Sequence, residues 1–98
     1  MKRFESVKVA GHIYQIQYMP EEWGDEMVRQ GDCCPTSLRI RISPNARWKE
    51  TLIHEIGHAI YYEYSIGHCS EEESTNSLYM SGMHQVMVDN PSLIRELL

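Results

Sequence analysis

The chain has 98 residues, of which 42% are hydrophobic and 23% are charged, and these proportions are typical of one small folded domain. We therefore expect a single domain over residues 1–98. The formal net charge is -5 and the nine Lys and Arg residues are scattered along the chain, which argues against nucleic-acid binding through a basic face. No stretch approaches the roughly 18 consecutive apolar residues of a membrane span.

The cysteines favour a reducing compartment. There are three of them, Cys33, Cys34 and Cys69, and two adjacent cysteines cannot easily bond to each other, so a disulfide framework is not expected. The first residues lead into no apolar signal core. We therefore expect a cytoplasmic protein with free thiols.

The first part of the chain has the pattern of strands. Apolar and polar residues alternate from Val7 to Met19 on both sides of Gly11, which predicts a hairpin. Residues Met27 to Cys34 are interpreted as a short edge strand. Residues Leu38 to Ile42 alternate cleanly, which indicates a strand with one buried face and its two arginines solvated. These strands predict a small antiparallel sheet.

A helix is predicted next. Ser43 and Pro44 form a helix start signal, with the serine as N-cap. Apolar residues recur every three or four positions at Leu52, Ile53, Ile56, Ala59 and Ile60. This spacing predicts an amphipathic helix to about Ser65, with these residues in an apolar stripe on the core. Gly67 is a plausible stop.

A second helix is predicted to start at Ser70 to Glu73, which match a capping box, and to run to about Val88. Residues Pro91 to Leu98 then read as a short terminal helix. The fold class is therefore α+β, with residues 1–43 mainly β and residues 44–98 mainly α.

The first long helix carries the sequence His54-Glu55-Ile56-Gly57-His58, an H-E-x-x-H motif. Two histidines four residues apart leave one helix face and can converge on a zinc ion. Glu55 would be the general base that activates a zinc-bound water for attack on a peptide carbonyl. The lack of a side chain at Gly57 would let a strand or a substrate approach closely. We expect a zinc-dependent metallopeptidase.

The third zinc ligand is less defined by the residues alone. Glu72 and Asn76 would share one helix face, with Glu72 on the metal and Asn76 accepting the N–H of a ligand histidine. In a strictly antiparallel helix pair, Glu72 would be about 6 Å out of level with the histidines. Glu73, His68 and Glu71 stay open as alternatives.

Other features of the chain add candidates. Tyr61 and Tyr64 stand where the metzincin pattern has glycine and histidine, so that pattern is absent. Cys69 has no C-x-x-C partner for a closed structural zinc site. The phenols of Tyr61, Tyr62, Tyr64 and Tyr79 could each donate a hydrogen bond to a developing oxyanion.

With these motifs in place, the segment Thr51 to Ala59 resembles the active-site helix of the ImmA/IrrE-like metallopeptidases, which include small phage-encoded relatives. Downstream, Glu72-x-x-Thr75-Asn76-x-Leu78 is similar to the E-x-x-A-N-x-F motif of that family. The resemblance implies Glu72 as third zinc ligand and a gluzincin with a minimal zincin-like fold, in which a second helix carries that ligand.

The likeness covers Ser43 to about Asn90 and implies a protein or peptide substrate. Family members with known roles cut transcriptional repressors, but this chain shows no helix-turn-helix or sensor domain, so the substrate is not carried over. The alternative function is a non-catalytic acidic regulatory or binding module that keeps zinc as a structural staple. Glu55 argues against it, because a purely structural site needs no carboxylate beside its ligands.

Overall fold

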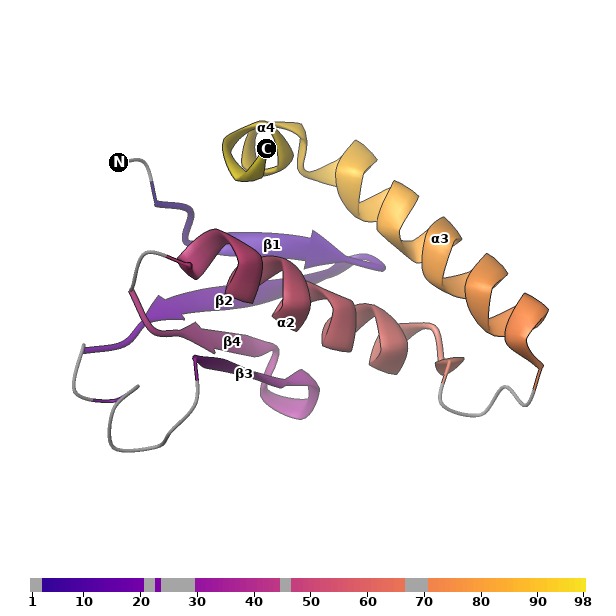
Figure 1. The fold of residues 1–98 in the computed structure, drawn as a ribbon, viewed down its shortest axis with the longest axis horizontal. Coiled ribbons are helices and arrows are strands. Elements are labelled where there is room, and N and C mark those ends of the chain that lie inside the picture. Colours follow the sequence, from indigo (N-terminus) through magenta and orange to yellow (C-terminus); the bar gives the residue numbers. More distant parts are fainter. Residues whose placement is uncertain (1–2, 21–22, 24–29, 45–46, 67–70) are drawn as a thin grey trace.

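The computed structural model describes residues 3–20, 23, 30–44, 47–66 and 71–98. In this part of the chain a small four-stranded sheet is covered by helices (Figure 1), so the α+β class is confirmed. The elements are β1 (Ser6–Val9), β2 (His12–Tyr18), β3 (Gly31–Cys34), the short 3-10 helix η1 (Pro35–Ser37), β4 (Arg39–Ile42), α2 (Trp48–Glu63), α3 (Glu72–Asp89) and α4 (Pro91–Leu97).

The predicted hairpin is confirmed. Strands β1 and β2 pair in antiparallel fashion, with Val9 opposite His12. Between them Ala10 and Gly11 both have positive φ, 51° and 84°, which suits a two-residue hairpin turn. The alternating residues of β1 and β2 turn one face of the hairpin to the core.

The sheet has the order β1-β2-β4-β3 and is mixed, because β2 and β4 run parallel. The prediction of an antiparallel sheet is therefore wrong for this pair. Strand β4 takes a central position, where Ile40 and Ile42 are completely buried, whereas β3, with the polar Asp32, forms an edge. From β2 the chain runs first to the edge position of β3 and then turns back as β4, which lies between β3 and β2. Strand β4 is antiparallel to β3 and therefore runs in the same direction as β2.

The outer face of the sheet is not simply solvated, contrary to the prediction for the two arginines. Nε of Arg41 donates a hydrogen bond of 2.9 Å to Oδ1 of Asp32, and the guanidinium lies 5.3 Å from the ring centroid of Trp23. Arg41 thus ties β4 to the edge strand.

Helix α2 begins at Trp48, so the predicted start at Ser43 is wrong. Ser43 is buried, and its N–H donates to the carbonyl of Gln30 at 2.7 Å. This bond continues the sheet beyond β4, so the backbone at Ser43 still pairs with the edge strand and the helix starts only at Trp48. The helix ends at Glu63, close to the predicted end, and Gly67 lies outside the described residues.

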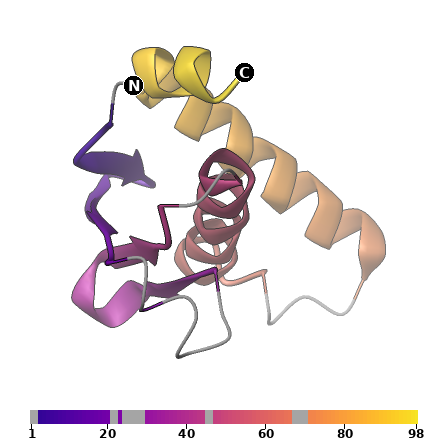
Figure 2. The same cartoon turned by 60° about the vertical axis from the view of Figure 1, so that its left-hand side comes forward.

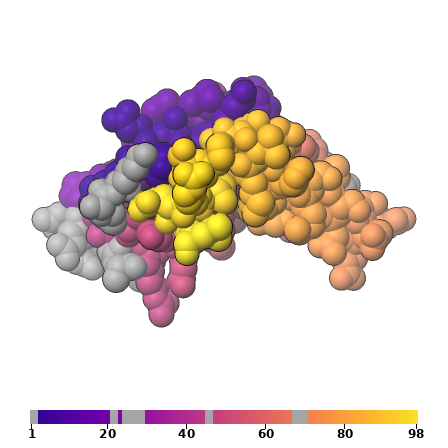
Figure 3. Space-filling model, turned by 90° about the horizontal axis from the view of Figure 1, so that it is seen from above, coloured from indigo at the N-terminus to yellow at the C-terminus, as the bar shows by residue number. Residues whose placement is uncertain are grey.

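The core lies between the sheet and the helices, with α2 across one sheet face and α3 and α4 beside it (Figure 2). Its buried hydrophobic residues are Val7, Val9, Tyr14, Ile16, Ile40, Ile42, Trp48, Leu52, Ile56, Ala59, Ile60, Ile66, Val86, Leu93 and Leu97. In Figure 3 the surfaces of α3 and α4, in orange and yellow, adjoin the hairpin, in indigo. Among the described helices, none is both long and apolar enough to cross a membrane.

The two C-terminal helices agree with their predicted extents. Helix α3 ends at Asp89, one residue beyond the predicted end, and α4 docks through Leu93 and Leu97. The N-cap of α3 is Glu71, whose side chain makes no capping bond. Ser70, the predicted cap, lies outside the described residues.

Candidate active site

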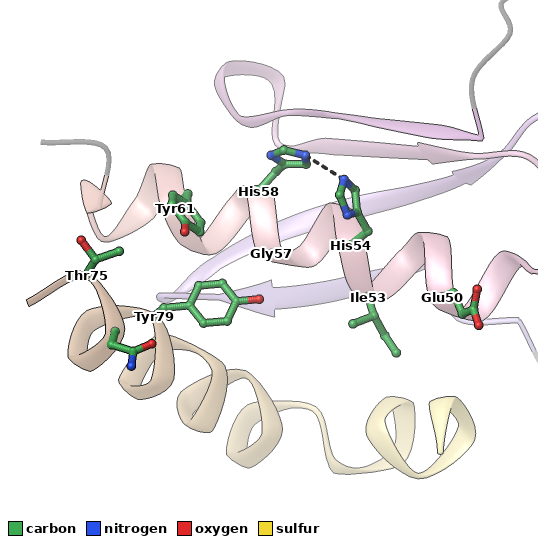
Figure 4. Close-up of a pocket in the computed structure, with 9 residues that line it drawn as sticks. Glu50, Ile53, His54, Gly57, His58, Tyr61, Thr75 and Tyr79 are labelled. Carbon is green, nitrogen blue, oxygen red and sulfur yellow. Dashed lines mark hydrogen bonds between the residues drawn. The ribbon is translucent and has the colours of Figure 1, made fainter. Parts of the chain in front are cut away.

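The two histidines of the H-E-x-x-H motif converge on the exposed side of α2 (Figure 4). Their Nε2 atoms lie 3.1 Å apart, and the ring centroids are 4.8 Å apart at an interplanar angle of 82°. The spacing of one helical turn brings them together, as the sequence predicts. At this distance one ring can donate its N–H to the other.

The same geometry fits two corners of a zinc site. Two nitrogen ligands at about 2.0–2.1 Å from a tetrahedral zinc ion are about 3.3 Å apart, and the observed Nε2–Nε2 distance is 3.1 Å. Within the described residues, no three His, Cys, Asp or Glu side chains are grouped to hold a metal ion. The structure thus brings His54 and His58 together, with no third ligand beside them in the described part of the chain.

Glu72 is exposed and is the first residue of α3. It does not line the pocket that the histidines share, whereas Thr75 and Asn76, one turn further on, do. The start of α3 therefore faces the site, but the structure does not place the Glu72 carboxylate in it.

Of the alternative third ligands, the two that the structure describes, Glu71 and Glu73, are not grouped with the histidines either. Glu71 is the N-cap of α3, and Glu73 lines another hollow on that helix together with Asn76, Ser77 and Met80. His68 and Cys69 lie outside the described residues.

Glu55 points to the sheet side of the histidine pair. Its exposed fraction is only 5%, and a Cβ atom on Gly31, in edge strand β3, would lie 3.3 Å from Cγ of Glu55. A cavity of about 440 Å³ opens there. It is lined by Gln30, Gly31, Arg47, Glu50, Thr51, His54 and Glu55.

Glu55 also acts on the neighbouring strand. Burial raises the pKa of the Cys33 thiol to about 12, and the charge of Glu55 adds to this effect. The candidate base thus shares a partly buried environment with β3, while His54 next to it reaches the solvent-exposed side of α2.

A second pocket, of about 500 Å³, lies between α2 and α3. It is lined by Glu50, Ile53, His54, Gly57, His58, Tyr61, Thr75, Asn76 and Tyr79. A Cβ atom on Gly57 would lie 3.1 Å from the hydroxyl oxygen of Tyr79. The missing side chain at Gly57 therefore admits a tyrosine of α3, where the sequence led us to expect a strand or a substrate.

The structure separates the four candidate tyrosines. Tyr61 and Tyr79 line this pocket, with ring centroids 5.6 Å apart. Tyr62 is exposed and lies outside the pocket lining, and Tyr64 packs against Gly82.

The prediction that put Ile53 in the core is wrong, because Ile53 is 41% exposed at the pocket.

Sequence reasoning missed Ile53 as a pocket residue, although a signal was available. Ile53 directly precedes a motif histidine, and an apolar residue about 100° around the helix from that histidine lies at the border of the exposed face.

No protein-family model, curated protein or solved structure matches the chain.

Proposed function

We propose that this protein is a zinc-dependent metallopeptidase with a minimal zincin-like fold, which hydrolyses a peptide bond in a cytoplasmic protein. The observation that carries the proposal is the 3.1 Å separation of the His54 and His58 Nε2 atoms, with Glu55 as their neighbour on α2. His54, His58 and Glu72 would hold the ion. When bound, zinc would supply a Lewis acid that polarises a carbonyl and lowers the pKa of water to about 7.

The carboxylate of Glu55 is the proposed general base. It takes a proton from the attacking water and later gives it to the leaving amine. Its near-complete burial beside Gly31 restricts the side chain to a small volume next to His54. Such restriction favours catalysis, because the base need not be oriented anew in each turnover.

The two cavities define a path for an extended substrate. Both are lined by His54 and Glu50, so a peptide that passes from one to the other crosses His54 beside Glu55. Strand β3 pairs only with β4 among the described strands. Its outer edge can accept backbone hydrogen bonds from an added strand.

One sequence observation and one structural observation support this proposal. The segment Thr51 to Ala59 and the Glu72-x-x-Thr75-Asn76 sequence resemble the ImmA/IrrE-like metallopeptidases. Cys33 and Cys34 are free, which fits the reducing conditions of the cytoplasm.

Zinc content and cleavage of a peptide library, measured on the same variants, test the proposal. We expect Glu55→Gln to retain stoichiometric zinc and to cut at least about 100-fold more slowly than the wild type, because the base is lost while the ligands remain. Glu72→Ala is expected to bind zinc at least about 100-fold more weakly, because losing a ligand costs more than losing an outer-shell partner. The matched change Glu73→Ala is expected to bind zinc normally.

Two outcomes contradict the proposal. Full zinc affinity in Glu72→Ala would remove Glu72 from the ligand set. If zinc raises the stability of the wild type but no peptide is cut, the site is a structural staple of a binding module.

A further inference from the structure

The pocket between α2 and α3 exposes apolar surface beside the motif histidines. Ile53 and Tyr61 are 41% and 45% exposed, and both line the pocket together with His54 and His58. Large apolar side chains that gather at the rim of a concave site mark a binding surface. The proposed hydrolysis does not itself account for them.

The pocket is long enough for part of an extended peptide. Its lining runs along α2 from Glu50 to Tyr61, which corresponds to about 16 Å at 1.5 Å per residue. At one end lies Glu50 and at the other Tyr61 with Thr75 (Figure 4). The volume of about 500 Å³ exceeds that of a single side chain.

Among the described residues, no Asp, Glu, Lys or Arg side chain lines the middle of the pocket. Ile53, Gly57 and Tyr79 line it there, and the ring of Tyr79 lies between the two helices (Figure 4). The cavity on the sheet side differs, because Arg47, Glu50 and Glu55 line it together with polar residues. The two sides of His54 therefore offer different environments to a substrate.

We propose that the pocket between α2 and α3 binds an uncharged apolar side chain, branched aliphatic or aromatic, of the substrate residue next to the scissile bond. This inference rests on the proposed function, because it places the scissile bond at His54 and Glu55. Contact with Ile53 and the Tyr61 and Tyr79 rings removes apolar surface from water on both sides, which favours such a residue over a polar one of equal size.

Cleavage-site profiling on a randomised peptide library tests the preference. We expect wild-type cleavage sites to be enriched about 10-fold or more in Leu, Ile or Phe at one position next to the cut. Ile53→Ala and Tyr61→Ala are each expected to lower kcat/KM for these peptides about 10-fold.

The chain offers matched controls for both changes. Ile13, on β2, is 47% exposed and Tyr62 is 55% exposed, and neither lines the pocket. Ile13→Ala and Tyr62→Ala are expected to stay within about 2-fold of the wild type. Equal losses in the controls, or no enrichment at any position, would overturn the inference.

A binding measurement decides the inference independently of cleavage. N-acetyl-leucinamide and the similarly sized N-acetyl-asparaginamide are titrated into the Glu55→Gln protein and followed by NMR. The leucine compound is expected to shift the ring signals of Tyr61 and Tyr79, and the asparagine compound is not.

The two proposals fail in different ways. Selective binding of the leucine compound to Glu55→Gln, together with a wild type that cuts no peptide, supports apolar binding in the pocket and contradicts the peptidase. Peptide cleavage without apolar preference, and without binding of the leucine compound, supports the peptidase and overturns the pocket.

Discussion

A Cβ atom on Gly57 would lie 3.1 Å from the hydroxyl oxygen of Tyr79, so α2 and α3 meet closely beside the histidine pair. This nearest atom is the end of a flexible side chain, which can withdraw by a few tenths of an ångström. Alanine also gains about 1 kcal/mol of helix propensity over glycine. We expect Gly57→Ala to leave the free energy of unfolding unchanged or to raise it by up to about 1 kcal/mol, as measured by urea unfolding.

The opposite result is expected at Gly82, the other glycine at this helix contact. A Cβ atom there would lie 2.7 Å from Cγ2 of Ile60 and 2.9 Å from the Tyr64 ring, and Ile60 is completely buried. We expect Gly82→Ala to destabilise the protein by about 1–3 kcal/mol through overpacking. Ser81→Ala, an exposed change in the same helix, is the control. Equal stability of the two variants would contradict this close packing.

The side chain of Asn90 forms hydrogen bonds with the outer edge of strand β1. Its Oδ1 accepts the N–H of Lys8 at 2.9 Å, and its Nδ2 donates to the carbonyls of Lys8 and Val86 at 2.8 and 2.9 Å. Asn90→Asp keeps the shape but loses the donor and sets a carboxylate against two carbonyl oxygens. We expect a loss of about 1–3 kcal/mol in urea unfolding at pH 7.

Asp89 provides the matched control for that change. Its Oδ1 accepts a hydrogen bond from Gln85 on an exposed part of α3. Asp89→Asn is expected to change the stability by less than about 0.5 kcal/mol. Similar losses in both variants would mean that the amide of Asn90 does not hold β1.

The structure shows which sequence signals were sufficient. The hairpin at Gly11 and the helix after Pro91 depend on neighbouring residues, so local patterns predicted them. The parallel pairing of β2 with β4 depends on segments far apart in the chain. The start signal at Ser43 gave a wrong helix start because the backbone of Ser43 still pairs with that of Gln30 in the sheet. A local sequence pattern does not contain this pairing.

The same distinction holds in the candidate site. The convergence of His54 and His58 follows from a four-residue spacing on one helix. Their neighbours Thr75, Asn76 and Tyr79 come from α3, and their positions depend on how two helices cross. Propensity and periodicity do not specify that crossing.

The adjacent cysteines of β3 should differ in reactivity. Burial raises the pKa of Cys33 to about 12. The hydroxyls of Ser37 and Thr36 lie 3.4 and 3.6 Å from Sγ of Cys34 and lower the pKa of that thiol. Because the thiolate is the reactive form, we expect iodoacetamide at pH 8 to label Cys34 and to spare Cys33.

The pH dependence of iodoacetamide labelling tests the raised pKa of Cys33. Labelling of Cys33 should rise only as the pH approaches about 12. In 8 M urea Cys33 should be labelled at ordinary alkaline pH, because unfolding returns the thiol to its ordinary pKa. Mass spectrometry of Cys33→Ser and Cys34→Ser variants identifies the labelled residue. Equal rates for both cysteines in the folded protein would contradict the burial of Cys33.

Tyr79 is the tyrosine best placed to act in the proposed reaction, since its hydroxyl lies beside Gly57 within the motif and its side chain lines the pocket of the histidines. A phenol O–H directed at a developing oxyanion stabilises the transition state more than the ground state. We expect Tyr79→Phe to lower kcat about 10- to 1000-fold, with KM changed less than about 3-fold and zinc content unchanged.

Phenylalanine keeps the apolar ring, so this variant separates the hydroxyl from the side-chain pocket. The preference for an apolar residue beside the cut should survive in Tyr79→Phe, whereas the rate should not. Tyr62→Phe, at an exposed position outside the pocket, should behave like the wild type. Normal kcat in Tyr79→Phe together with a low kcat in Tyr61→Phe would move the oxyanion role to Tyr61, the other tyrosine in the pocket.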